Sequence, residues 1–225
     1  MQFRCSVDTP DTKNPIFSKY AFHSTDMNDN PNILYRINER DEIVFVNDEW
    51  MRFACENDAP ELAAREFLNR SLWDFITDDT VREIYRKLIE KARANQIVSF
   101  DFRCDAPDWR RLLEMTVGLC EDGNVQFETC VVRREKRIRQ DVFEKDFPRG
   151  ESILNVCSWC NKIDTGGKNW KEVEEAVLTL ALFVRNELPQ LSHGMCSPCY
   201  QKISEQLQNR TAEKSRATHY ETPSV

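Results

Sequence analysis

The stretch IVSFDFRCDAPDWRRLLEMTVGLCEDGNVQFETCVVR, residues 97–133, decides the fold of the first half of the chain. It holds three runs in which apolar and polar residues partly alternate, as in strands with one buried face. Pro107 and Asp108 separate the first two runs, and the turn-forming residues around Gly123 separate the last two. The stretch therefore predicts an antiparallel meander of three strands.

Two shorter strands and two helices are predicted before this meander. The runs 33–37 (ILYRI) and 43–46 (IVFV) are β-branched and aromatic, and polar residues separate them, which indicates a hairpin. A short helix should follow over 48–56. Thr77 or Asp78 can cap a longer helix whose apolar residues recur at three- and four-residue spacing. This order predicts an α+β domain over residues 31–134, with a five-stranded antiparallel sheet and the helices on one face.

The phrases IVFVNDEWMRFA (43–54) and LNRSLWDFI (68–76), in this order of elements, resemble a PAS sensor domain. The resemblance implies a sensing or interaction role and pairing into a homodimer through flanking helices. The reactive cysteine phrase of the flavin-binding PAS proteins is missing, since Cys55 lies in FACEND, and residues 31–134 contain no histidine to bind haem. The resemblance therefore leaves the PAS ligand, and whether there is one, undetermined.

Composition limits the possible partners. The chain has 225 residues, 38 acidic and 31 basic, and a formal net charge of -7, which argues against nucleic-acid binding through bulk positive charge. No apolar run is long enough for a membrane span, and the first residues lack the apolar segment of a secretory signal. We therefore expect a cytoplasmic protein that does not enter a membrane.

Three further segments are expected to carry no core of their own. Residues 1–30 are polar and should form a flexible arm, and residues 205–225 should form a flexible tail. Residues 135–152 should be a helical linker that ends at Pro148 and Gly150. The five basic residues between Arg133 and Arg139 fit a solvated helix, or a contact with an acidic partner or nucleic acid.

Residues 153–204 are expected to form a small helical module around two C-x-x-C pairs, Cys157 with Cys160 and Cys196 with Cys199. This spacing turns both thiolates of a pair toward one ion, so the four cysteines predict a tetrahedral zinc site. A redox dithiol pair and an iron–sulfur cluster are the alternatives. Between the pairs, apolar residues at helical spacing predict one helix from Trp170 to about Leu188.

The segment from Cys157 to Cys199 resembles the small cysteine module that follows PAS or receiver domains in bacterial signalling proteins. The positions that match its pattern are Cys157, Trp159, Cys160, Lys162, Ile163, Asp164, Trp170, Glu174, Ser192, His193, Gly194, Cys196 and Cys199. Asn161 stands where a lysine is frequent, and Ser197 stands where a proline is usual. His193 could be a metal ligand, a donor to a thiolate, or a loop residue bonded to the backbone.

Motifs of the common enzyme classes are absent from the sequence. It has no zinc-deaminase, G-x-S-x-G, P-loop, dinucleotide or kinase phrase. The sequence therefore predicts a non-enzymatic signal-transduction protein, in which a PAS-type domain is coupled to a zinc-stabilised module that binds a partner protein. The alternatives are a zinc-module nucleic-acid-binding regulator that uses its PAS part to dimerise, and a thiol redox sensor or oxidoreductase.

Overall fold

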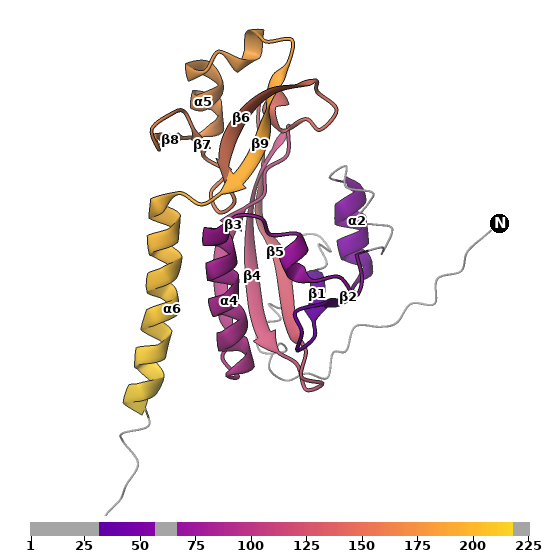
Figure 1. The fold of residues 1–225 in the computed structure, drawn as a ribbon, viewed down its shortest axis with the longest axis vertical. Coiled ribbons are helices and arrows are strands. Elements are labelled where there is room, and N and C mark those ends of the chain that lie inside the picture. Colours follow the sequence, from indigo (N-terminus) through magenta and orange to yellow (C-terminus); the bar gives the residue numbers. More distant parts are fainter. Residues whose placement is uncertain (1–31, 57–66, 218–225) are drawn as a thin grey trace, which may run out of the picture.

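The computed structural model describes residues 32–56 and 67–217, which form two sheets and four α-helices (Figure 1). The first sheet is antiparallel throughout, in the order β2-β1-β5-β4-β3. Its strands are β1 (Ile33–Ile37), β2 (Ile43–Val46), β3 (Val98–Arg103), β4 (Trp109–Leu119) and β5 (Val125–Lys136). The predicted α+β class and five-stranded antiparallel sheet are thus confirmed.

Two helices of this first part begin where the sequence predicts. They are α2 (Asp48–Glu56) and α4 (Asp79–Arg93). Asp78 caps α4, because its side-chain Oδ1 accepts a hydrogen bond from the backbone N–H of Val81 at 2.9 Å. A short 3-10 turn, η1 (Leu72–Asp74), precedes it. The apolar face of α4 is buried against the sheet, with Ile84 and Leu88 fully enclosed.

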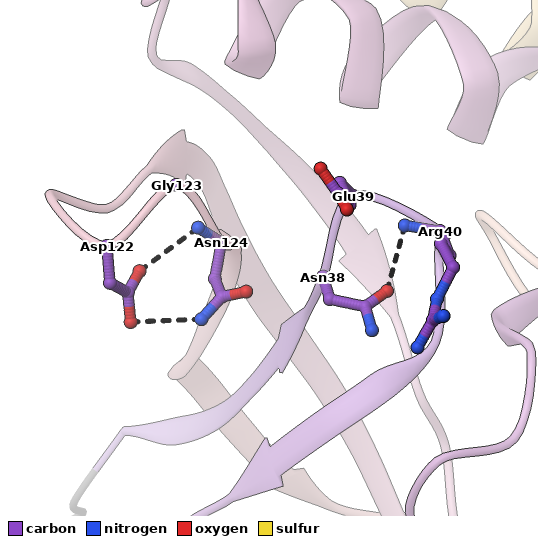
Figure 2. A pocket seen from close by; sticks show the side chains of 6 residues that line it. All are labelled: Asn38, Glu39, Arg40, Asp122, Gly123 and Asn124. Carbon is purple, nitrogen blue, oxygen red and sulfur yellow. Dashed lines mark hydrogen bonds between the residues drawn. The ribbon is translucent and has the colours of Figure 1, made fainter.

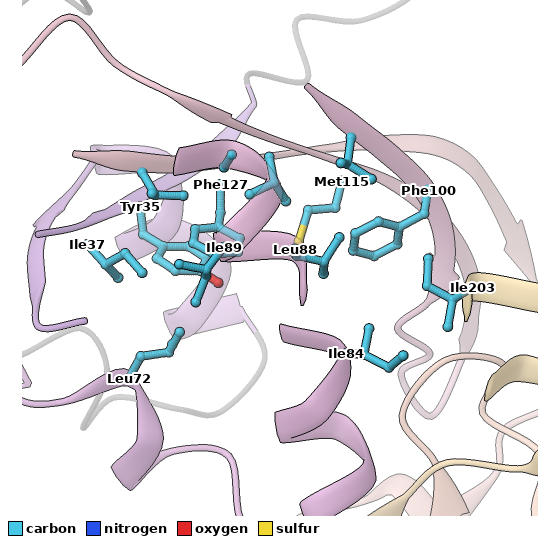
Figure 3. Close-up of a cluster of buried hydrophobic side chains, with 14 of the residues drawn as sticks. Tyr35, Ile37, Leu72, Ile84, Leu88, Ile89, Phe100, Met115, Phe127 and Ile203 are labelled. Carbon is cyan, nitrogen blue, oxygen red and sulfur yellow. The ribbon is translucent and has the colours of Figure 1, made fainter. Parts of the chain in front are cut away.

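Aliphatic and aromatic side chains fill the core between α4 and the sheet (Figure 3). Tyr35 of β1 stacks on Phe127 of β5 with ring centroids 4.5 Å apart, and Tyr85 of α4 stacks on the same ring at 5.9 Å. The opposite face of the sheet is polar, as shown by the 3.0 Å hydrogen bond between the Ser99 and Thr116 hydroxyls. The strands therefore bury one face, as their alternating pattern predicts.

The second part of the chain contains a four-stranded sheet as well as helices, and the prediction of a small helical module missed this sheet. Its strand order is β8-β7-β6-β9, and β6 and β9 run parallel. The elements are β6 (Arg149–Cys157), β7 (Ile163–Asp164), β8 (Trp170–Lys171), α5 (Val173–Thr179), the 3-10 turn η3 (Leu182–Val184), β9 (Leu188–Gly194) and α6 (Ser197–Ala217).

The helix predicted from Trp170 to Leu188 is interrupted. Helix α5 covers only Val173–Thr179, because Ala181 adopts a left-handed backbone conformation with φ of 49°. Leu182 and Leu188 then bury their side chains in a second core, with Val156 of β6 and Val173 of α5. Most of the apolar residues used for this prediction are indeed buried or partly buried. They are divided, however, among helix α5, the 3-10 turn η3 and strand β9.

The predicted helical linker is also wrong. Strand β5 continues to Lys136, a 3-10 turn η2 (Asp141–Phe143) follows, and β6 begins at Arg149. The chain stays extended because β5 pairs with β4 as far as Trp109 and Lys136. Gln140 and Val142 are buried, and Val142 packs in the second core, so the segment between β5 and β6 is held against the rest of the fold.

Residues 205–217, predicted as part of a flexible tail, belong to helix α6. Leu207 lies one helical turn after Ile203, and both are buried in the core beside α4. The Tyr200 hydroxyl also donates a hydrogen bond of 3.1 Å to Glu83 of α4. The predicted N-terminal arm, residues 1–30, lies outside the described residues. In the part of the chain that is described, no helix has the length and apolarity needed to cross a membrane.

The first core extends into the second part of the chain. Cys157, Trp159 and Cys196 are buried with the residues of α4 and β3, and Ile203 and Leu207 join the same cluster. Figure 3 shows Ile203 beside Ile84 and Phe100. The sequence segments 31–134 and 153–204 therefore contribute to one common core.

Candidate metal centre

Two strand ends and one helix start bring the four cysteines together. Cys157 is the last residue of β6, Cys160 lies in the turn that follows, and Cys196 and Cys199 flank the start of α6. The parallel pairing of β6 with β9 places Cys157 opposite Gly194, two residues before Cys196. The ends of β6 and β9, which are far apart in sequence, thus bring the two cysteine pairs next to each other.

The four Sγ atoms form a compact group. They all lie within 4.8 Å of one another, and the Sγ atoms of Cys160 and Cys196 are 3.8 Å apart. All four thiols are free of disulfides. Cys157 and Cys196 are buried, whereas Cys160 and Cys199 are partly exposed. Such a group can bind one metal ion with four sulfur ligands.

Backbone hydrogen bonds shape the first cysteine pair into a tight turn. The N–H of Asn161 donates to the carbonyl of Cys157 at 2.9 Å, and the N–H of Cys157 donates to the carbonyl of Lys162 at 2.8 Å. Asn161 has φ of 55°, a left-handed conformation that asparagine adopts more readily than most residues. This backbone requirement explains why an asparagine fits directly after Cys160.

The thiols interact strongly with one another. Hydrogen bonds from Cys160 and Cys199 hold the pKa of the Cys157 thiol far below its ordinary value, and the backbone N–H of Cys196 approaches the same sulfur at 3.4 Å. The hydrogen bond to Cys157 raises the pKa of Cys160 to about 12, and the pKa of Cys199 is raised for the same reason. The pKa of one thiol is thus lowered at the expense of its two neighbours, and a bound metal ion would supply the positive charge that favours deprotonation of the sulfur ligands.

The first cysteine pair is attached to the first sheet. Trp159 is buried and stacks on Phe100 of β3, with ring centroids 4.8 Å apart. The backbone N–H of Arg103, at the end of β3, donates to the carbonyl of Trp159 at 2.8 Å. The candidate site therefore sits against β3 and at the start of α6.

His193 does not belong to the sulfur group. It lies on β9 with an exposed side chain. Among the described residues, the side chains that come close enough together to share a metal ion are the four cysteines alone. The ligand role considered for His193 gains no support from this placement, and its role as a donor to a thiolate stays a prediction.

The single cysteines of the first part lie outside the group. Cys55 is exposed, Cys104 and Cys130 are partly buried, and Cys120 is buried. Burial raises the pKa values of the Cys104 and Cys130 thiols, which keeps them protonated at neutral pH. Cys5 falls outside the described residues.

An ionic network beside the site was not predicted from the sequence. Asp105, whose side chain is fully buried, pairs with Arg103 and with Arg137, the latter at 3.0 Å. Arg137 also approaches Glu174 of α5 at 3.5 Å. Because Glu174 is far from the arginine in sequence, only the folded structure shows that the pair joins the segment directly after β5 to α5.

A polar pocket lies at the opposite end of the first sheet, between the β1–β2 and β4–β5 turns (Figure 2). Asp122 accepts hydrogen bonds from the backbone and side-chain nitrogens of Asn124, at 3.0 and 2.9 Å. Asn38 accepts one from the backbone of Arg40 at 2.9 Å. These groups bond to one another, so the cysteine group is the stronger candidate site.

The comparisons with known proteins leave the site to be interpreted from its own chemistry. No protein-family model matches this sequence, and no curated protein matches it.

Proposed function

We propose that this chain is a non-enzymatic signal-transduction protein, in which a PAS-like domain is coupled to a zinc-stabilised cysteine module and acts by binding a partner protein. The observation that supports it best is the group of four cysteine Sγ atoms within 4.8 Å of one another. This group shares a core with the antiparallel sheet. A change in either part can therefore alter the other.

Zinc is the proposed ion because two C-x-x-C pairs supply four thiolates in the arrangement typical of structural zinc sites. Cys157, Cys160, Cys196 and Cys199 would hold it, and it would neutralise their charge. Four sulfur ligands close the coordination shell, so the site would offer no open position for a substrate or an activated water. This closed shell supports a structural and signalling role over a hydrolytic one.

Metal analysis of the purified protein tests the metal assignment. The protein would be purified without added metal, and its zinc, iron and absorption spectrum would be measured together. We expect a colourless protein with one zinc per chain. A brown protein with iron and sulfide would favour a cluster, and a metal-free protein that turns over disulfide substrates would favour the redox alternative.

Hydrogen exchange tests the proposed coupling. After a chelator removes the zinc, we expect the amides of α4 and β3 to exchange faster, because Trp159 and Cys196 pack in their core. Unchanged exchange in α4 and β3 would contradict the coupling. Light scattering on the full chain tests the homodimer implied by the PAS resemblance, and a monomer at every concentration would exclude it.

A further inference from the structure

The end of β5 and Ile138, two residues after it, present unusual exposed side chains. Ile138 is 85% exposed, the highest fraction among the large exposed apolar side chains described, and Val132 is 54% exposed. Arg134 and Lys136 lie between them at alternate strand positions, so both project from the same face of the sheet. Both are exposed. An exposed branched apolar residue next to two cations is not explained by the core of either sheet.

The backbone that carries Ile138 is fixed on both sides. Its neighbour Arg137 is nearly buried and pairs with Asp105, while Arg139 pairs with Asp108 at 2.9 Å and with Asp141 at 3.1 Å. The side-chain amide of Gln140, a buried residue, donates to the carbonyl of Ile138 at 3.0 Å. Ile138 is therefore presented by an ordered segment, and binding there would require little further ordering.

The two cations of this surface are available for binding. Within the described part of the chain, neither Arg134 nor Lys136 forms an ion pair, whereas Arg133 pairs with Glu135. The Arg134 guanidinium lies over the ring of Trp109 on β4, with its central carbon 4.1 Å from the ring centroid. This contact holds the guanidinium in place without neutralising its charge. Two exposed cations without an ion pair among the described residues thus lie here on a protein whose formal net charge is -7.

We propose that Arg134, Lys136 and Ile138 form a docking surface for an acidic segment of a partner protein that carries an apolar side chain. Carboxylates of the segment would pair with Arg134 and Lys136, and its apolar side chain would cover Ile138. This proposal rests on the partner-binding role of the proposed function and names the class of partner. It does not require the metal at the cysteine group.

Two features favour a protein segment over a nucleic acid. Ile138 and Val132 offer apolar surface, which matches an apolar side chain better than a phosphate backbone. The overall acidic charge would also repel a polyanion beyond the reach of these few cations.

Selection from a library of short random peptides tests the docking surface. The full-length protein, with its metal content measured, would be immobilised and the enriched peptides sequenced. We expect peptides that combine aspartate or glutamate with a large apolar residue. Their binding, followed by fluorescence anisotropy, should weaken about tenfold or more in Ile138→Ser and in the double variant Arg134→Glu/Lys136→Glu.

Matched variants make the result specific. Phe183→Ser removes another exposed apolar side chain, and Lys168→Glu/Lys202→Glu reverses two exposed cations elsewhere. Both should bind the selected peptides as the wild type does. Circular dichroism checks the fold of each variant. No enrichment, enrichment of basic peptides, equal binding by Ile138→Ser, or tighter binding of a single-stranded oligonucleotide than of any peptide would overturn the proposal. If the purified full-length protein contains no zinc but still binds the selected peptides, this would count against the proposed metal site alone.

Discussion

The indole of Trp159 lies between the first two cysteines in sequence and stacks on the phenyl ring of Phe100, with the ring centroids 4.8 Å apart. This contact places the candidate metal centre against the edge strand β3 of the first sheet. The stability of the sheet and of the cysteine group should therefore depend on each other.

Replacing Trp159 with alanine should destabilise the whole described fold by about 3–5 kcal/mol, because it leaves a cavity beside Phe100. Thermal unfolding followed by circular dichroism would show one transition at a lower temperature. Phe183→Ala, at a residue that is 66% exposed, is the control and should change the midpoint little. Two separate transitions, with the sheet unaffected, would show that the two parts fold independently.

Replacing Cys196 with serine should abolish stoichiometric zinc binding. Metal binding at such sites contributes on the order of 10 kcal/mol, and much of it stabilises the fold. Metal analysis should therefore show a lower zinc content in the variant. Urea unfolding should show a midpoint at a lower urea concentration. Cys55→Ser alters an exposed thiol outside the group and should leave both unchanged. Full zinc occupancy in Cys196→Ser would refute the ligand assignment.

Replacing Asp105 with asparagine should be strongly destabilising, by about 3–5 kcal/mol, because Arg137 would keep its buried charge without the carboxylate that balances it. The comparison variant Asp101→Asn changes an exposed carboxylate on β3 and should cost little. Urea unfolding at neutral pH gives both values. If Asp105→Asn were as stable as the wild type, the other partners of Arg137 would be sufficient to balance its charge, and the prediction would be wrong.

Glu174 should contribute to the loss of stability in acid. Burial would raise the pKa of its carboxyl, but its own backbone N–H together with Arg110 and Arg137 lowers the pKa overall. Because the folded pKa lies below the unfolded one, the carboxylate stabilises the fold above its unfolded pKa, near 4.3, and this contribution is lost as the pH falls further.

Glu174→Gln should therefore be less stable than the wild type at neutral pH, and the difference should shrink below about pH 4. Unfolding midpoints of both proteins across this range measure it. Acid also protonates the thiolates, but that effect is common to the two proteins and cancels in the difference. Glu205→Gln, at an exposed residue of α6, should show no pH-dependent difference.

The strands of the first sheet could be predicted because their side chains alternate between core and solvent. Asp78 was likewise recognisable as a helix cap. The short strands β7 and β8 have two residues each, too few for any periodicity to be seen. Ala181 adopts its left-handed conformation without the glycine that would mark such a position, so the end of α5 was missed.

The cysteine group could be predicted from the spacing within each pair together with the ligand number of zinc, whereas its surroundings could not. Cys157 and Cys160 are neighbours in sequence, and their pairing with Cys196 and Cys199 follows from the preference of zinc for four ligands. The contact between Trp159 and Phe100 joins residues whose separation leaves no trace in any sequence pattern. The burial of Leu207 was missed for the same reason, because α4 lies far from it along the chain.

Helix α6 begins within the candidate metal centre, since Cys199 lies in its first turn, and the following turns rest on α4 through Ile203 and Leu207. With 21 residues it is about 31 Å long. A long rigid rod that pivots near one end converts a slight change of angle there into a much larger displacement at the other. Metal gain or loss at the cysteines would therefore act first on the start of α6, and a small change of angle there would be largest at the far end of the helix.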